Sequence, residues 1–157
     1  MPAIEHINPP GLLQLDAFSQ VVVVSGGRTA YIAGQGAFDQ NMKLIGPNDL
    51  HAQTVQAFRN LRTALAALGV GPERVVSSTM YVVDLDDAKA GILVAAMNVA
   101  LDGAAFPPNA STLVGVTRLG MSGMLVEVSA VALLDAHRAR APAFPLRALA
   151  ATCACPG

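Results

Sequence analysis

The chain has 157 residues, of which 53% are hydrophobic and 13% are charged, and its formal net charge at pH 7 is −1. Length and apolar content fit one folded domain and exclude a disordered chain. Ten Lys and Arg with 4% aromatic residues argue against a nucleic-acid surface, and no apolar run approaches the roughly 20 residues of a membrane helix.

The chain begins with a segment, residues 1–17, that we predict to be an irregular N-terminal arm, because Asn8-Pro9-Pro10-Gly11 cannot continue a helix. It has no basic and apolar leader, so the cytoplasm is the expected location. The apolar runs 20–24 and 29–33 follow. Two glycines between them, Gly26 and Gly27, predict a tight hairpin.

Two segments have a helical pattern. Residues 49–68 carry apolar side chains at three- and four-residue steps, with Asp49 as a candidate cap and Gly69 as a candidate end. A second helix is predicted from Asp86 to about Leu101, where the two acidic residues at 86 and 87 suit a helix N-terminus.

Residues 74–83, 111–116 and 125–134 are rich in strand-forming side chains. The predicted order is β-β-α-β-α-β-β, an α+β class in which two helices cover one face of a mixed sheet. The other face would be exposed in a single chain. Packing of such faces between subunits would explain the high apolar content.

The domain is expected to span residues 18–135, followed by a poorly ordered C-terminal extension at 136–157. That extension holds the chain's two cysteines, Cys153 and Cys155. They are too close together in the sequence to staple a core. The three histidines are too widely separated for a metal site, so no metal and no cofactor are expected.

Glu127 is a carboxylate within an apolar strand. Side chains alternate along a strand, so Glu127 shares a face with Ser129 and Val131, whereas Val126 and Val128 lie on the other face. An unpaired charge is costly to bury. Glu127 is therefore either solvated at the sheet margin or a cleft residue that transfers protons.

Several segments in the same order resemble the Rid/YjgF family, which includes enamine and imine deaminases. The segments are Leu15 to Gln20, Tyr31 to Gln35, His51 to Thr54, Asn60-Leu61 before Leu68-Gly69, Thr79 to Leu85, Met97-Asn98, Ala110 to Val116 and Leu125 to Val128. The resemblance implies a chorismate-mutase-like fold, a homotrimer, and ligand clefts at the subunit boundaries.

The resemblance also implies site residues. A glutamate that positions or activates water corresponds to Glu127. Residues that hold the substrate correspond to Phe18, Gly34, Asn98 and Leu113, with Phe18 standing where deaminases usually have tyrosine.

The arginine with which deaminases grip the substrate carboxylate is missing, because its position is occupied by Ser111. A charge-assisted hydrogen bond contributes about 1.5–3 kcal/mol and a neutral one about 1 kcal/mol, so carboxylate affinity should fall about tenfold or more. Arg28 or Arg118 could substitute from elsewhere in the assembly.

Three interpretations follow. The chain could hydrolyse a small imine, enamine or related C–N metabolite, without the usual 2-aminoacrylate specificity. It could bind a small metabolite, such as a keto-acid-like ligand, without catalysis. Alternatively, its apolar cleft could serve only the packing of the trimer. None of the three involves nucleic acid or a membrane.

Overall fold

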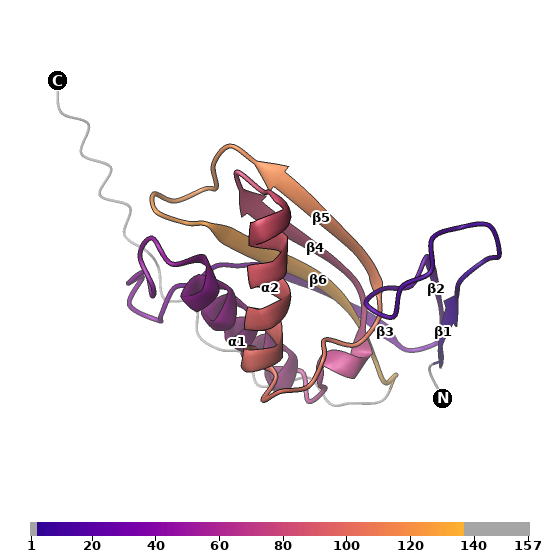
Figure 1. Cartoon of the computed structure of the whole chain (residues 1–157). Coiled ribbons are helices and arrows are strands. Elements are labelled where there is room, and N and C mark those ends of the chain that lie inside the picture. Colours follow the sequence, from indigo (N-terminus) through magenta and orange to yellow (C-terminus); the bar gives the residue numbers. More distant parts are fainter. Residues whose placement is uncertain (1–2, 137–157) are drawn as a thin grey trace, which may run out of the picture.

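A computed structural model describes residues 3–136 of the chain as two helices on one face of a four-stranded sheet, with a separate two-stranded ribbon (Figure 1). The strands are β1 (Ala3–Ile7), β2 (Val21–Ser25), β3 (Arg28–Gln35), β4 (Val75–Val83), β5 (Ala110–Val116) and β6 (Val126–Leu134). The α-helices are α1 (Leu50–Ala67) and α2 (Asp87–Ala100), and a 3-10 turn (Pro72–Arg74) precedes β4.

The four-stranded sheet has the order β3-β6-β4-β5. The strands β4 and β5 are parallel and are joined through α2, while β6 is antiparallel to both of its neighbours. This confirms the predicted mixed sheet with helices on one face. The boundaries of the predicted domain stay a prediction, and residues 137–157, with both cysteines, lie outside the described residues.

The predicted hairpin between the first two apolar runs is wrong. The strand β2 pairs with β1, which lies inside the segment predicted to be irregular, and β3 pairs instead with β6. Both Gly26 and Gly27 have positive φ, 68° and 73°, so the link bends sharply. A pair of glycines is typical of hairpin turns and of other sharp bends, so it does not identify which strands pair. The prolines at 9 and 10 indicated an irregular segment, and the short strand before them was therefore missed.

Both predicted helices are confirmed to within one residue at each end. Asp49 caps α1 by accepting a hydrogen bond from the Ala52 N–H, and Gly69 follows its C-terminus with φ at 71°. Asp86 caps α2 in the same way through the Lys89 N–H. The caps explain why these boundaries could be placed from sequence.

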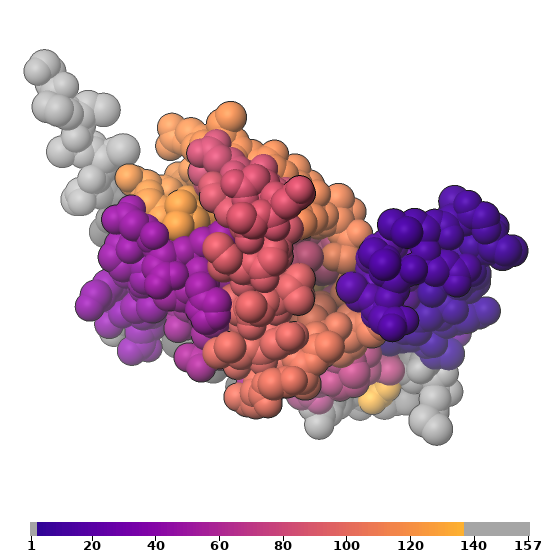
Figure 2. All heavy atoms as spheres, in the orientation of Figure 1, coloured from indigo at the N-terminus to yellow at the C-terminus, as the bar shows by residue number. Residues whose placement is uncertain are grey.

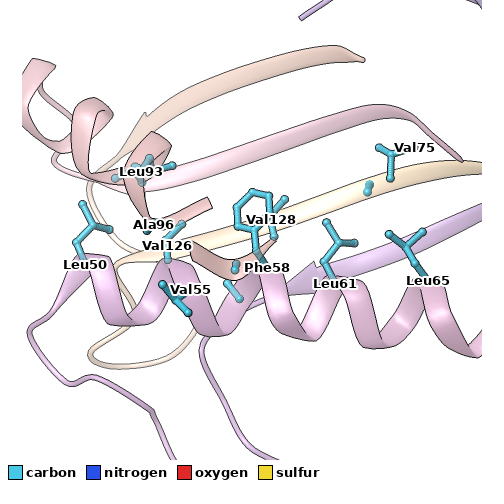
Figure 3. Close-up of a cluster of buried hydrophobic side chains, with 14 of the residues drawn as sticks. Leu50, Val55, Phe58, Leu61, Leu65, Val75, Leu93, Ala96, Val126 and Val128 are labelled. Atoms are coloured by element: carbon cyan, nitrogen blue, oxygen red, sulfur yellow. The ribbon is translucent and has the colours of Figure 1, made fainter. Parts of the chain in front are cut away.

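The hydrophobic core lies between the helices and the sheet. Phe58, Leu61 and Leu65 point from α1 toward β4 and β6, where Val75, Val126 and Val128 receive them (Figure 3). Phe58 also meets the ring of Phe106 edge-on, with centroids 5.4 Å apart. One face of the sheet is thereby buried, and the opposite face carries no helix among the described residues.

A buried amide fixes where β6 begins. The Gln53 side chain of α1 is fully buried and donates to the carbonyls of Gly46 and Gly123, at 3.2 and 2.9 Å. Its Oε1 accepts from the Leu125 N–H at 2.8 Å. The Leu125 carbonyl in turn accepts from the Val83 N–H. Gln53 therefore ties α1 to the residue that leads into β6.

Replacing Gln53 with alanine should destabilise the fold by at least about 2 kcal/mol, because each buried group left unpaired costs about 1–3 kcal/mol. Urea unfolding at one fixed protein concentration measures the change. Gln56→Ala is the matched control on the same helix. Gln56 makes one side-chain bond, to Asn60, and its loss should cost under about 1 kcal/mol. Equal costs for the two variants would contradict the anchoring role.

Candidate functional site

The main candidate site is a cavity of about 330 Å³ between α2, the strands β4 and β5, and the segment that leads into β2. Figure 2 shows α2 and the N-terminal segment on either side of this hollow. The residues that line it are mostly apolar and none is charged: Ala17, Phe18, Phe58, Ser78, Met80, Ala90, Leu93, Val94, Met97, Phe106, Asn109, Ser111 and Leu113.

Three polar side chains are grouped in the cavity wall. Ser78 Oγ lies 2.8 Å from Asn109 Oδ1 and 3.2 Å from Ser111 Oγ. Asn109, which is 1% exposed, also donates from Nδ2 to the Pro107 carbonyl at 3.1 Å. Every polar atom of the buried Asn109 amide therefore has a partner.

The structure places Phe18, Ser111 and Leu113 together in this cavity. The resemblance assigns Gly34, Asn98 and Glu127 to the same site, but these three do not line the cavity of a single chain. The parallel register pairs Ser78 with Ser111 and Met80 with Leu113. Paired residues of neighbouring strands point to the same face, so Ser111 and Leu113 share the helix-covered face of Ser78 and Met80.

Glu127 and Gly34 lie together on the opposite face of the sheet. Glu127 pairs with Tyr81 and is half-buried, whereas its neighbours Val126 and Val128 are buried under the helices. A Cβ on Gly34 would lie 2.6 Å from Glu127 Cδ and would overlap the carboxylate. The absence of a side chain at position 34 thus leaves room for the Glu127 carboxylate. No hydrogen bond within residues 3–136 holds that carboxylate.

Asn98 belongs to neither group within one chain. It is exposed near the end of α2, because the buried side of that helix carries Leu93, Ala96 and Ala100. Its main-chain carbonyl accepts from the Gly103 N–H at 2.7 Å and helps to end the helix. The role of its side chain stays a prediction.

Neither arginine considered as a substitute reaches Ser111 within one chain. Arg28 lies on β3, at the far edge of the sheet from β5, and donates to the Asp135 carbonyl. Arg118 follows Ser111 by seven residues of mostly extended chain, a separation of about 20 Å. Neither lines the cavity.

The described residues show no group of three or more His, Cys, Asp or Glu side chains that could hold a metal ion. Within the same residues, no helix is long and apolar enough to cross a membrane.

Some cavity residues were not predicted as site residues, in particular Ser78 and Phe106. Ser78 is a small polar residue that β4 turns toward the helices, and Phe106 comes before a proline pair. A polar side chain at a core-facing position of a strand is the signal that could have identified Ser78.

A mixed sheet with two helices on one face is the architecture of a known class of small α+β proteins. A family profile described as Endoribonuclease L-PSP matches residues 12–134, so the chain belongs to that family. This is the family also called Rid or YjgF, and the resemblance in the sequence is thereby confirmed.

Relatives and solved structures agree. The RutC family protein slr0709 of Synechocystis is 33% identical over 74% of this chain and 85% of its own length. The structure of YyfB from Yersinia pestis, a Rid family protein of unknown function, has a TM-score of 0.75 and 35% identity, covering 83% of this chain and 98% of that one.

Another relative carries an activity in its name. The 2-iminobutanoate/2-iminopropanoate deaminase of Rattus norvegicus is 33% identical to this chain over 46% of it, and the match spans about half (52%) of that enzyme. The similarity shows common descent.

Asn109→Ala should destabilise the fold by about 1–3 kcal/mol, because the Pro107 carbonyl and Ser78 lose their partner in a buried position. Asn98→Ala is the matched control. Its side chain is exposed, so the free energy of unfolding should change by no more than about 0.5 kcal/mol. Urea titration of both variants measures the difference. A similar small effect in both would mean that the buried amide is not needed for the fold.

Proposed function

We propose that the chain assembles as a homotrimer in which the cavity of one subunit is completed by Glu127 of a neighbour, and that this combined site hydrolyses a small imine or enamine. The observation that carries the proposal is the division of the candidate residues between the two faces of one sheet. Side chains on opposite faces of a sheet cannot meet within one chain, so a shared site requires a second copy.

Two features of the surface support assembly. The face that carries Glu127 has no helix over it among residues 3–136, and Tyr31 on that face is 83% exposed. In the part of the chain that the structure describes, the edge strands β3 and β5 each have a partner on one side only. Tyr31 shares this face with the half-buried Tyr81 and Val131, and an apolar surface of this kind is typical of a subunit contact. The location in the cell stays a prediction.

The proposed reaction is the hydrolysis of a C=N bond. The Glu127 carboxylate accepts a proton from water while the water oxygen bonds to the imine carbon and the C=N π electrons move to nitrogen. Proton return to nitrogen gives a neutral carbinolamine, which expels ammonia and leaves a carbonyl group. An enamine first becomes the imine by tautomerisation, in which its carbon gains a proton and its nitrogen loses one. These reaction steps need no cofactor.

The substrate is not expected to be a 2-aminoacrylate-like acid. Ser111 stands where the resemblance places an arginine, and the lining of the cavity holds no cation. A carboxylate entering such a cavity would lose its hydration without gaining a charged partner. An imine with an apolar body and no carboxylate fits the lining better.

Glu127→Gln should lower turnover by about 100-fold or more, because general acid–base catalysis contributes about 10²–10⁴. The assay forms imines in place, from 2-phenylethylamine with a flavin amine oxidase and from phenylalanine with a flavin amino-acid oxidase. It then records carbonyl product above the spontaneous rate. We expect faster turnover of the imine without a carboxylate.

Glu5→Gln is the control for Glu127→Gln, since Glu5 is exposed on β1, away from the cavity. Equal rates for wild type and Glu127→Gln, or no rate above the uncatalysed one, would refute the proposed hydrolysis.

Gly34→Ala should reduce turnover like Glu127→Gln and leave the melting temperature almost unchanged. The new methyl group meets the end of a flexible side chain, so the Glu127 carboxylate moves aside while the backbone stays. Gly120→Ala is the control, because no atom lies within 4 Å of the added group. A strong loss of stability in Gly34→Ala would instead indicate a structural role for the glycine.

Two observations favour a second candidate, a trimer that binds a small metabolite without catalysis. No charged side chain lines the cavity, and no hydrogen bond within the described part of the chain orients Glu127. Thermal stabilisation by the imine's carbonyl product, with no turnover in the same assay, would support this candidate. No effect on stability or turnover would leave only a packing role for the cavity.

A further inference from the structure

The hydrogen bonds around Asn109 fix the direction in which the cavity hydroxyls point. The Pro107 carbonyl can only accept, so the atom that faces it at 3.1 Å must be the Asn109 Nδ2 donor. The amide oxygen of Asn109 therefore faces Ser78, 2.8 Å away, and it too can only accept. Ser78 must use its single proton for this bond.

The same reasoning gives the direction of the Ser111 hydroxyl. Because the Ser78 proton is used by Asn109, Ser78 Oγ acts as the acceptor toward Ser111 Oγ at 3.2 Å. The Ser111 proton therefore points to Ser78. Only the lone pairs of Ser111 Oγ then remain free for a ligand. Toward a ligand, Ser111 is therefore a hydrogen-bond acceptor.

Within one chain, the rest of the cavity lining is apolar, and the cavity is large. Phe18, Phe58 and Phe106 contribute aromatic rings, and α2 contributes Val94 and Met97. An apolar cavity of about 150 Å³ holds benzene in another protein. The volume here, about 330 Å³, holds a ring with several further atoms.

We propose that this cavity binds uncharged molecules with an apolar or aromatic body through one N–H or O–H group donated to Ser111, and discriminates against carboxylates. The inference names the substrate class of the site proposed above and rests on that proposal for its catalytic meaning. Where an arginine would donate to a carboxylate, the ordered serine accepts. The N–H of a neutral imine or enamine has the matching polarity.

The test uses three one-ring probes with the full-length protein: phenol, which donates; anisole, in which a methyl group replaces the donor hydrogen; and benzoate, the carboxylate. Ligand-observed NMR titration gives the dissociation constants. We expect phenol to bind more tightly than benzoate. Ser111→Ala should lower the ratio of the anisole to the phenol dissociation constant by about 2- to 12-fold, the loss of one hydrogen bond.

Two further variants check the direction of the bonds. Ser78→Ala frees the Ser111 proton to donate to the anisole oxygen, so the same ratio should fall although Ser111 is intact. Ser111→Arg should instead raise benzoate affinity. The control is Thr112→Val, which keeps a β-branched residue next to Ser111 on the opposite face and should leave the ratio unchanged.

An unchanged ratio in Ser111→Ala and Ser78→Ala, tighter binding of benzoate than phenol to the wild type, or no binding of any probe at its solubility limit would overturn the inference. Binding and turnover are measured separately. If the ratios of dissociation constants change as expected but no turnover is detected, only the proposed hydrolysis is refuted. If turnover is detected but these ratios do not change, only the proposed acceptor role of Ser111 in the cavity is refuted.

Discussion

The alternation of side chains along β4, β5 and β6 determines what a single chain can do. The helices cover one face of these strands, so the core residues and the cavity share that face. Glu127 lies one residue from Val126 and Val128 and must therefore face the other way. The same constraint builds the core and divides the candidate site. Any activity that needs both Ser111 and Glu127 is consequently a property of an assembly.

Ser111 is more than the absence of an arginine. Ser78 and Asn109 orient it, and the Asn109 amide is oriented in turn by the Pro107 carbonyl. An arginine side chain carries only donors, so the two residues have opposite polarity toward a ligand. Serine in place of arginine at position 111 therefore predicts a different class of ligand. Loss of the positive charge alone would only weaken the binding of carboxylates.

Much of the fold was predictable because it rests on local signals. Both helices could be predicted from their apolar stripes and from the capping side chains of Asp49 and Asp86. The alternation of side chains along a strand predicted which face of the sheet carries Glu127. The partner of β2 was not predictable, since the choice between β1 and β3 depends on contacts between distant segments. The family resemblance assigned six residues to one site, of which Phe18, Ser111 and Leu113 line the cavity of a single chain. The contribution of Ser78 required knowledge of the register between β4 and β5.

The attachment of Leu125 to Gln53 has a consequence for how this chain can change in length. The residues between β5 and Gly123 come before the attachment, so an insertion or deletion there alters only a loop. One residue added or removed after Leu125 would turn every following side chain of β6 to the other face. The carboxylate would then lie beneath the helices, and the valines would lie on the face that no helix of the described residues covers. Between β5 and β6, tolerated length variation should therefore be confined to the loop ahead of Gly123.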